Sequence, residues 1–72
     1  MAKIKTDRFK LAEMRIRHGY SCTGLAKELG VSKQAVSLIE TGKTNPTPAL
    51  AKKIVEFLNV PYDCIFSIVE GD

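Results

Sequence analysis

The sequence predicts an all-α fold, a bundle of five short helices that forms one domain over residues 1–72. Three observations favour this fold. Apolar residues recur at the three- and four-residue spacing of helices, glycines and prolines interrupt that pattern at short intervals, and no segment shows persuasive strand alternation. Apolar residues make up 44% of the chain, which contains no Trp, so the core should be mostly aliphatic.

The first helix is expected from about residue 7 to residue 18, with Thr6 as its N-cap. Its apolar stripe begins with Phe9, Leu11 and Met14, which should pack against the rest of the bundle.

Two further helices lie close together in the middle of the chain. The earlier one follows the N-cap Ser21 and ends at Leu29, and the later one follows the N-cap Ser32 and ends at Gly42. Gly30 between them can adopt a positive φ, so the chain can turn sharply there. The apolar residues expected to pack this pair on the core are Leu25, Ala26, Leu29, Val31, Val36 and Ile39. Each feature alone also fits an ordinary αα-corner, but their joint spacing is typical of a helix-turn-helix.

A fourth helix should begin after the N-cap Thr47, with Pro48 in its first position, and end at Asn59. Its buried face is expected to contain Leu50, Ile54, Phe57 and Leu58. A fifth short helix is expected near residues 62–66. The tail segment IFSIV, residues 65–69, can also be extended, and the sequence leaves this open.

Charge and cysteine content limit the possible functions. The net charge is +3, although residues 60–72 contain acidic residues and no Lys or Arg, and a basic body of this kind suits an anionic partner without proving one. Cys22 and Cys64 are expected to be free thiols, because nothing indicates secretion. No apolar run is long enough to cross a membrane and no signal peptide is evident, so a cytoplasmic location is expected. The single His18 and the lack of a nucleophilic pair or carboxylate cluster argue against an enzyme, a metal site or a cofactor.

The stretch from Ser21 to Pro46, SCTGLAKELGVSKQAVSLIETGKTNP, resembles the DNA-binding domain of the Cro and phage-repressor (Xre-like) helix-turn-helix family. The resemblance extends from LAEMRIRHG in the first helix to VPYDCIF near the end of the chain. It implies a five-helix bundle of the lambda-repressor type, with the helix-turn-helix at about 21–41 and its third helix in the DNA major groove. It also implies an ion pair between Arg15 and Glu40.

The third helix should carry the base contacts. A helical step of 100° per residue turns one side of this helix away from the core: Gln34, Ser37, Leu38 and Thr41, with Lys33 on the flank. A Gln can form two hydrogen bonds with adenine, and a Lys can donate to guanine or to a phosphate. We therefore expect base contacts from Lys33, Gln34, Ser37 and Leu38. For Leu38 three roles are open: contact with a thymine methyl group, partial packing on the loop after Gly42, or part of a protein-binding surface.

Phosphate contacts are expected around this helix, because they position a DNA-binding protein and supply salt-dependent affinity. The residues concerned lie at helix N-termini and in the loop after the third helix: Ser21, Cys22, Thr23, Ser32, Thr41, Lys43, Thr44 and Asn45. Cys22 departs from the family, in which many members have Gln there, and a thiol is a poor donor. The loop can equally be an ordinary polar turn, and Lys3 and Lys5 can form either a flexible arm along the duplex or a frayed end.

The sequence therefore predicts a sequence-specific DNA-binding transcriptional regulator, a phage or prophage repressor or a Cro-like switch protein, that binds double-stranded operator DNA. No separate ligand-sensing domain is evident, so no effector is expected. A homodimer is expected because one recognition helix covers few base pairs. Its interface should lie in the tail, residues 61–69, at Tyr62, Ile65, Phe66, Ile68 and Val69, with Ile65 or Phe66 in the core.

The alternative function is that of an antirepressor or protein-interaction module on the same fold, which would bind a partner repressor. Three features favour it: Cys22 in place of Gln, Gly24 inside the second helix, and the outward position of Leu38.

Overall fold

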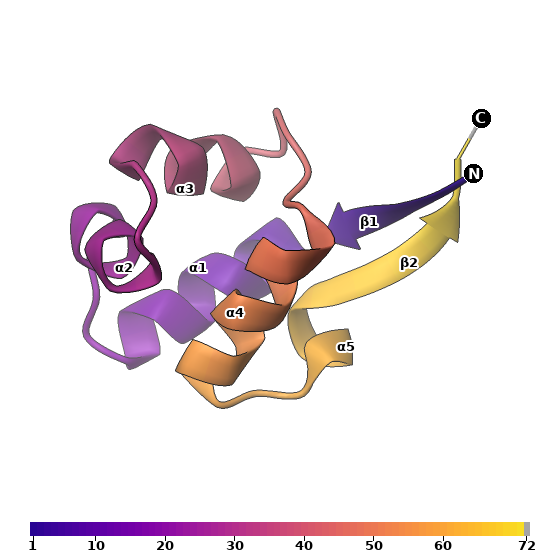
Figure 1. The fold of residues 1–72 in the computed structure, drawn as a ribbon. Helices are drawn as coiled ribbons and strands as arrows, with labels where there is room; N and C mark the ends of the chain where they lie inside the picture. Colours follow the sequence, from indigo (N-terminus) through magenta and orange to yellow (C-terminus); the bar gives the residue numbers. More distant parts are fainter. Residues whose placement is uncertain (72) are drawn as a thin grey trace.

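A computed structural model describes residues 1–71. In this range the chain forms five helices and two strands (Figure 1). In chain order these are β1 (Ala2–Thr6), α1 (Arg8–Arg17), α2 (Cys22–Leu29), α3 (Lys33–Glu40), α4 (Pro48–Leu58), α5 (Tyr62–Ile65) and β2 (Phe66–Glu70). None of these helices is long and apolar enough to span a membrane.

The predicted caps of the central helices are confirmed. Ser21 Oγ accepts a hydrogen bond from the Gly24 N–H at 3.0 Å, and Ser32 Oγ accepts one from the Ala35 N–H at 3.1 Å. Thr47 caps α4 in the same way. These side chains satisfy N–H groups that have no partner within the helix, which is why the helices begin where the sequence indicates.

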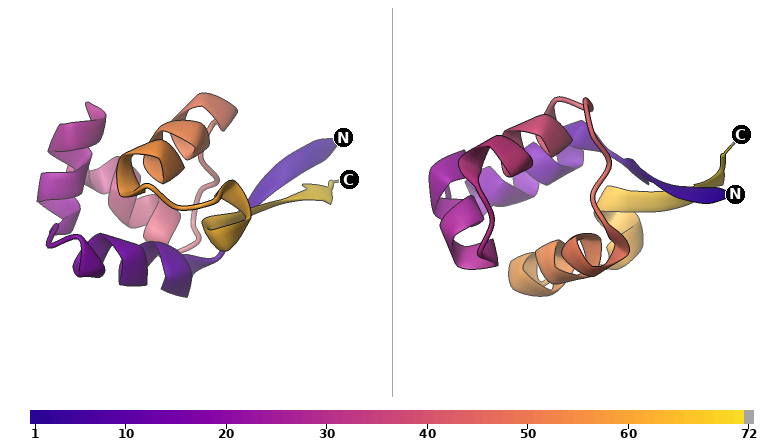
Figure 2. Two further views of the ribbon diagram at one scale, coloured as in Figure 1. Left: turned by 90° about the horizontal axis from the view of Figure 1, so that it is seen from below. Right: turned by 45° about the horizontal axis from the view of Figure 1, so that its top comes forward.

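The turn between α2 and α3 has the expected conformation. Gly30 has a φ of 74°, and the N–H of Val31 donates to Ala26 O at 3.0 Å. Lys53 on α4 donates to Leu29 O at 2.8 Å, so α4 also fixes the C-terminal end of α2. Figure 2 shows α2 and α3 as neighbours at one end of the molecule.

The prediction of an all-α fold is wrong in one respect, because β1 and β2 form a two-stranded antiparallel sheet. Ala2 lies opposite Glu70, Ile4 opposite Ile68 and Thr6 opposite Phe66. The tail is thus extended, which is one of the two structures that the sequence left open. Lys3 and Lys5 belong to a paired strand, and therefore form neither a frayed end nor a free arm.

Two predictions for the first helix are also wrong. The N-cap is Asp7, whose Oδ1 accepts from the Lys10 N–H at 3.1 Å, because Thr6 is still the last residue of β1. Phe9 is 75% exposed, whereas Leu11 is buried. Residues two apart on a helix differ by about 200°, so these two side chains cannot share one face.

The core lies between the helices and one face of the sheet. Its members are aliphatic except for one Phe: Ile4, Leu11, Leu25, Ala26, Leu29, Val36, Ile39, Ala51, Ile54, Val55, Leu58, Ile65 and Phe66. Of the face predicted for the fourth helix, Ile54 and Leu58 are buried, whereas Leu50 and Phe57 are partly buried.

Candidate nucleic-acid interface

The outer side of α3 is open to solvent. Val36 and Ile39 are buried in the core, so the opposite side of the helix points away from the domain. Lys33 and Gln34 are exposed in its first turn, where side chains of a recognition helix reach base edges. A shallow hollow of about 310 Å³ lies on this side, lined by Gln34, Ser37 and Leu38.

Leu38 is an exposed apolar residue in the middle of this surface. Its side chain is 38% exposed and is not part of the core. Its backbone carbonyl accepts hydrogen bonds from the N–H groups of Lys43 and Thr44, at 2.9 and 3.3 Å. The backbone of Leu38 therefore fixes the start of the loop after α3, while its side chain stays accessible to a ligand.

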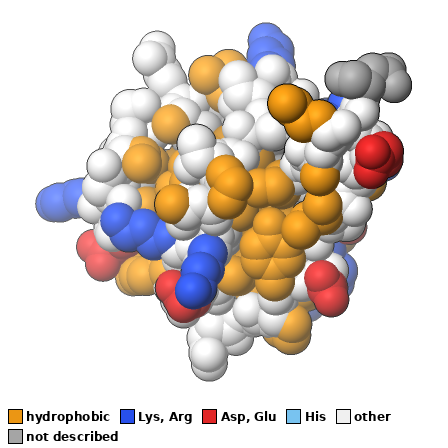
Figure 3. All heavy atoms as spheres, turned by 45° about the vertical axis from the view of Figure 1, so that its right-hand side comes forward, with side chains coloured by type: hydrophobic (Ala, Val, Ile, Leu, Met, Phe, Trp, Pro, Cys, Tyr) orange, Lys and Arg blue, Asp and Glu red, His pale blue; other side chains and the backbone are white. Residues whose placement is uncertain are grey.

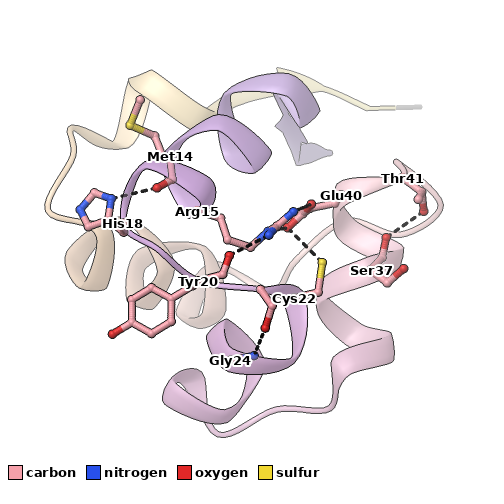
Figure 4. Close-up of polar contacts among 10 residues, drawn as sticks. Met14, Arg15, His18, Tyr20, Cys22, Gly24, Ser37, Glu40 and Thr41 are labelled. Carbon is pink, nitrogen blue, oxygen red and sulfur yellow. Dashed lines mark hydrogen bonds and ion pairs between the residues drawn. The ribbon is translucent and has the colours of Figure 1, made fainter.

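Arg15 of α1 holds the C-terminal end of α3. Its Nε donates to Glu40 Oε2 at 2.7 Å, and its Nη2 donates to Glu40 Oε1 at 3.1 Å (Figure 4). Its Nη1 also donates to Tyr20 O at 2.8 Å. The hydrogen bonds from Arg15 to Glu40 raise the pKa of the guanidinium above its ordinary value. The ion pair implied by the family resemblance is thus present as a two-pronged contact, a strong form of this interaction.

A second arginine of α1 contacts the same end of α3. Arg8 Nη1 donates to Thr41 O at 2.9 Å, and the Arg8 side chain also covers Gly42. No sequence pattern indicates this contact. A lone Arg near the start of a helix has no local signal that links it to a carbonyl 33 positions away.

Most of the predicted phosphate-binding residues are exposed. Ser21, Thr23 and Ser32 are exposed at the N-termini of α2 and α3. Those helix ends present amide N–H groups and a positive dipole end, which favour an anion. Thr41, Lys43, Thr44 and Asn45 are exposed in or before the loop that leaves α3. The Thr41 hydroxyl donates to Ser37 O at 2.9 Å.

Cys22 is the exception among these residues. Its side chain is partly buried, and its Sγ donates to Glu40 Oε2 at 3.8 Å (Figure 4). The thiol lies beside the Arg15–Glu40 pair, so the expected phosphate contact from this side chain does not fit its position. Both Cys22 and Cys64 are free thiols, as the sequence predicted.

The tail contains both core and surface residues. Ile65 and Phe66 are each 1% exposed and belong to the core, so neither can form the predicted dimer interface. Ile65 ends α5 and Phe66 begins β2, so the alternation of a single strand does not force these neighbours onto opposite sides. Tyr62 and Val69 are partly buried, and Ile68 is 66% exposed.

Exposed and partly buried apolar residues gather beside the sheet. We use the name apolar shelf for Ala2, Pro48, Tyr62 and Ile68, which line one hollow of about 180 Å³ together with Lys3 and the buried Ile4. Figure 3 shows hydrophobic side chains gathered on this side of the molecule. Tyr62 packs on the core residue Phe66, with 5.4 Å between ring centroids. No sequence pattern indicates that Ala2 and Pro48 belong here, because they come from segments distant from the tail.

The comparisons with known proteins agree with this geometry. Residues 11–63 match the helix-turn-helix family model. An uncharacterized HTH-type transcriptional regulator of Methanocaldococcus jannaschii is 44% identical over 88% of this chain and 94% of its own length. The uncharacterized HTH-type transcriptional regulator YgzD of Bacillus subtilis is 36% identical over 85% of this chain and 92% of its own length.

Some relatives are much longer. A putative HTH-type transcriptional regulatory protein of Methanocaldococcus jannaschii is 43% identical over 81% of this chain, which spans 18% of that relative's length. The shared part is therefore the domain that contains α2 and α3. This chain belongs to the helix-turn-helix family of the Xre and Cro type.

Proposed function

We propose that this chain is a DNA-binding transcriptional regulator that recognises a specific operator with α3 in the major groove. The observation that carries the proposal is the outer side of α3, where Lys33 and Gln34 are exposed beside the hollow at Leu38. The printed names of the relatives, HTH-type transcriptional regulators, support the same function.

In this proposal each residue of the outer side has a distinct role. Gln34 forms a pair of hydrogen bonds with one adenine, and Lys33 donates to guanine or to a nearby phosphate. Ser37 contacts a base or the backbone at the edge of the hollow. Leu38 contacts a thymine methyl group, because an exposed apolar side chain gains from burial against that methyl.

Phosphate contacts on both sides of α3 set its orientation on the duplex. The amide N–H groups at the N-termini of α2 and α3 contact one strand, and the loop with Lys43, Thr44 and Asn45 contacts the backbone beyond α3. These groups carry little sequence information, and the positive charge of Lys43 makes its contribution depend on salt.

We further propose a two-fold homodimer through the apolar shelf. Two copies would place their recognition helices about 34 Å apart, one turn of DNA, on a palindromic operator. The support for this interface is the exposed apolar surface of Ile68 and its neighbours. Contact with a second copy would remove this surface from water, which is favourable. Bound at such an operator, the dimer would act as a repressor or Cro-like switch of the phage type by excluding other proteins from the site.

Selection of duplexes from a random pool by the purified protein tests the proposal. Titration of a labelled selected duplex then compares the wild type with Gln34→Ala. We expect Gln34→Ala to lose about 1–3 kcal/mol of binding free energy on the selected duplex and to lose its preference at one base pair. Lys43→Ala is the matched control, because loss of a phosphate contact should weaken binding to selected and scrambled duplexes by the same factor.

The rival function, an antirepressor that binds a partner regulator, is favoured by one observation. Phe9 and Ile16 lie two turns apart on α1 and are 75% and 64% exposed, so α1 carries two large apolar side chains that nothing within residues 1–71 covers. If the wild type enriches no sequence and its weak binding does not depend on salt, DNA recognition by α3 is wrong and this rival becomes the working function.

A further inference from the structure

We propose that the outward face of the two-stranded sheet is a second phosphate-binding site, which contacts the DNA backbone beside the loop after α3. Its ligand is a phosphodiester group of duplex DNA, and its cationic residues are Lys3 and Lys5. This inference rests on the proposed DNA-binding function and extends its contact surface to the first strand of the chain.

The two faces of the sheet differ in character. Successive side chains of a strand point to opposite faces, so the register places Lys3 beside Val69 and Lys5 beside Ser67 on one face. The other face contains Ile4 and Phe66, which are buried in the core. Lys3 and Lys5 are both exposed. The sheet thus presents a pair of lysines on the side that does not pack on the domain.

These lysines lie next to the predicted DNA-binding loop. A hollow of about 450 Å³ is lined by Lys3, Ile4, Lys5, Asn45 and Val69, so the strand and the loop share one concave surface. In Figure 1 the loop lies between α3 and β1. Asn45 is among the residues proposed to contact phosphate, and the lysines therefore continue the same row of contacts away from α3.

The two lysines of this face are not held in ion pairs with the described residues. Within residues 1–71 no ion pair joins Lys3 or Lys5 to a carboxylate. Asp7 and Asp63 line a separate hollow with Lys5, and neither forms an ion pair with it. A phosphate that enters the first hollow therefore meets two ammonium groups and an amide side chain, and no acidic residue lines that hollow.

The ladder between β1 and β2 also holds the lysines in place. All five residues of β1 are paired with β2, and the buried Ile4 fixes the strand against the core. A flexible arm would lose backbone entropy on binding DNA, whereas a paired strand has already lost it in the free protein. The contact is therefore preorganised.

The salt dependence of DNA binding tests the inference. The probe is the duplex selected by the wild type, and affinity is measured between 0.05 and 0.2 M salt, about the range over which such contacts change affinity most. Lys3→Gln and Lys5→Gln should each reduce the slope of log K against log salt concentration by about 0.9, and the double variant by about twice that amount. Lys3→Arg and Lys5→Arg keep the charge and should keep the wild-type slope.

Lys52→Gln is the matched control, because Lys52 is an exposed lysine on α4 that does not line the hollow. An equal fall in slope for Lys52→Gln would overturn the proposal, since it would show a general charge effect. Unchanged slopes for the Lys3 and Lys5 variants would also overturn it, while sequence-specific binding by the wild type would leave the function of α3 intact. If the wild type itself binds no duplex in a salt-dependent way, both proposals fail together.

Discussion

At the scale of single residues, the Arg15 guanidinium joins three parts of the chain. It extends from α1, donates to the Glu40 carboxylate at the end of α3 and donates to the Tyr20 carbonyl in the loop before α2. The two partners are 14% and 11% exposed, so water screens the charges only in part. Arg15 therefore fixes the position of α3 relative to the rest of the domain.

Removal of Glu40 should destabilise the domain. Glu40→Ala leaves the Arg15 guanidinium partly buried without its carboxylate, and we expect a loss of about 2–3 kcal/mol in the free energy of unfolding. Urea denaturation followed by circular dichroism measures this loss. Glu13→Ala is the control, because Glu13 forms ion pairs with Lys10 and Arg17 that are more exposed, and we expect a much smaller change there. Equal midpoints for Glu40→Ala and the wild type would contradict the role given to this pair.

At the scale of elements, local signals explain the helices and long-range pairing explains the sheet. Ser21, Ser32 and Thr47 act within three residues of themselves, so a sequence pattern can detect them. β1 and β2 each have five residues and lie at opposite ends of the chain. A two-stranded sheet is marginal by itself and depends on packing against a helix, which no local pattern records. The alternation of Lys3, Ile4 and Lys5 was a weak signal for β1.

The connection after α3 contains a glycine that lies against the Arg8 side chain. Gly42 has a φ of 78°, and a Cβ there would lie 2.8 Å from Arg8 Cδ, so Gly42→Ala must displace the side chain that donates to Thr41 O. We expect the free energy of unfolding to fall by about 1–2 kcal/mol. Part of this loss comes from the strain of Ala in a left-handed backbone conformation, and part from the displaced Arg8 hydrogen bond.

A double-mutant cycle separates the two parts. In an Arg8→Ala background, Gly42→Ala should cost about 0.5–1 kcal/mol less than in the wild type, as measured by urea denaturation. Gly30→Ala is the control, because its φ is 74° and the nearest atom to its Cβ is Lys53 Nζ at 3.9 Å. The cost of Gly30→Ala should not depend on Arg8. A cost for Gly42→Ala that is also independent of Arg8 would show that the arginine does not constrain this end of α3.

At the scale of the whole molecule, β1 and β2 come from opposite ends of the chain and form one sheet with two different faces. The sequence could predict the outer side of α3, because helical periodicity alone separates Gln34 from Val36. It could not predict the apolar shelf, which combines Ala2, Pro48 and Ile68 from three separate segments. It also could not show that both Ile65 and Phe66 are core residues, because the apolar pattern is the same whether one or both side chains are buried.

The apolar shelf determines the oligomeric state that we expect for this chain. If two copies meet at this surface, Ile68→Glu introduces a charge at the interface of each copy, and we expect the dissociation constant of the dimer to rise more than tenfold. Sedimentation velocity over a range of protein concentrations measures this change. Ile16→Glu is a closely matched control, because Ile16 is 64% exposed on α1 and Ile68 is 66% exposed on β2. If Ile16→Glu weakens the dimer and Ile68→Glu leaves it intact, the interface lies on α1. If the wild type stays monomeric at high concentration, the two-fold dimer does not form in the absence of DNA.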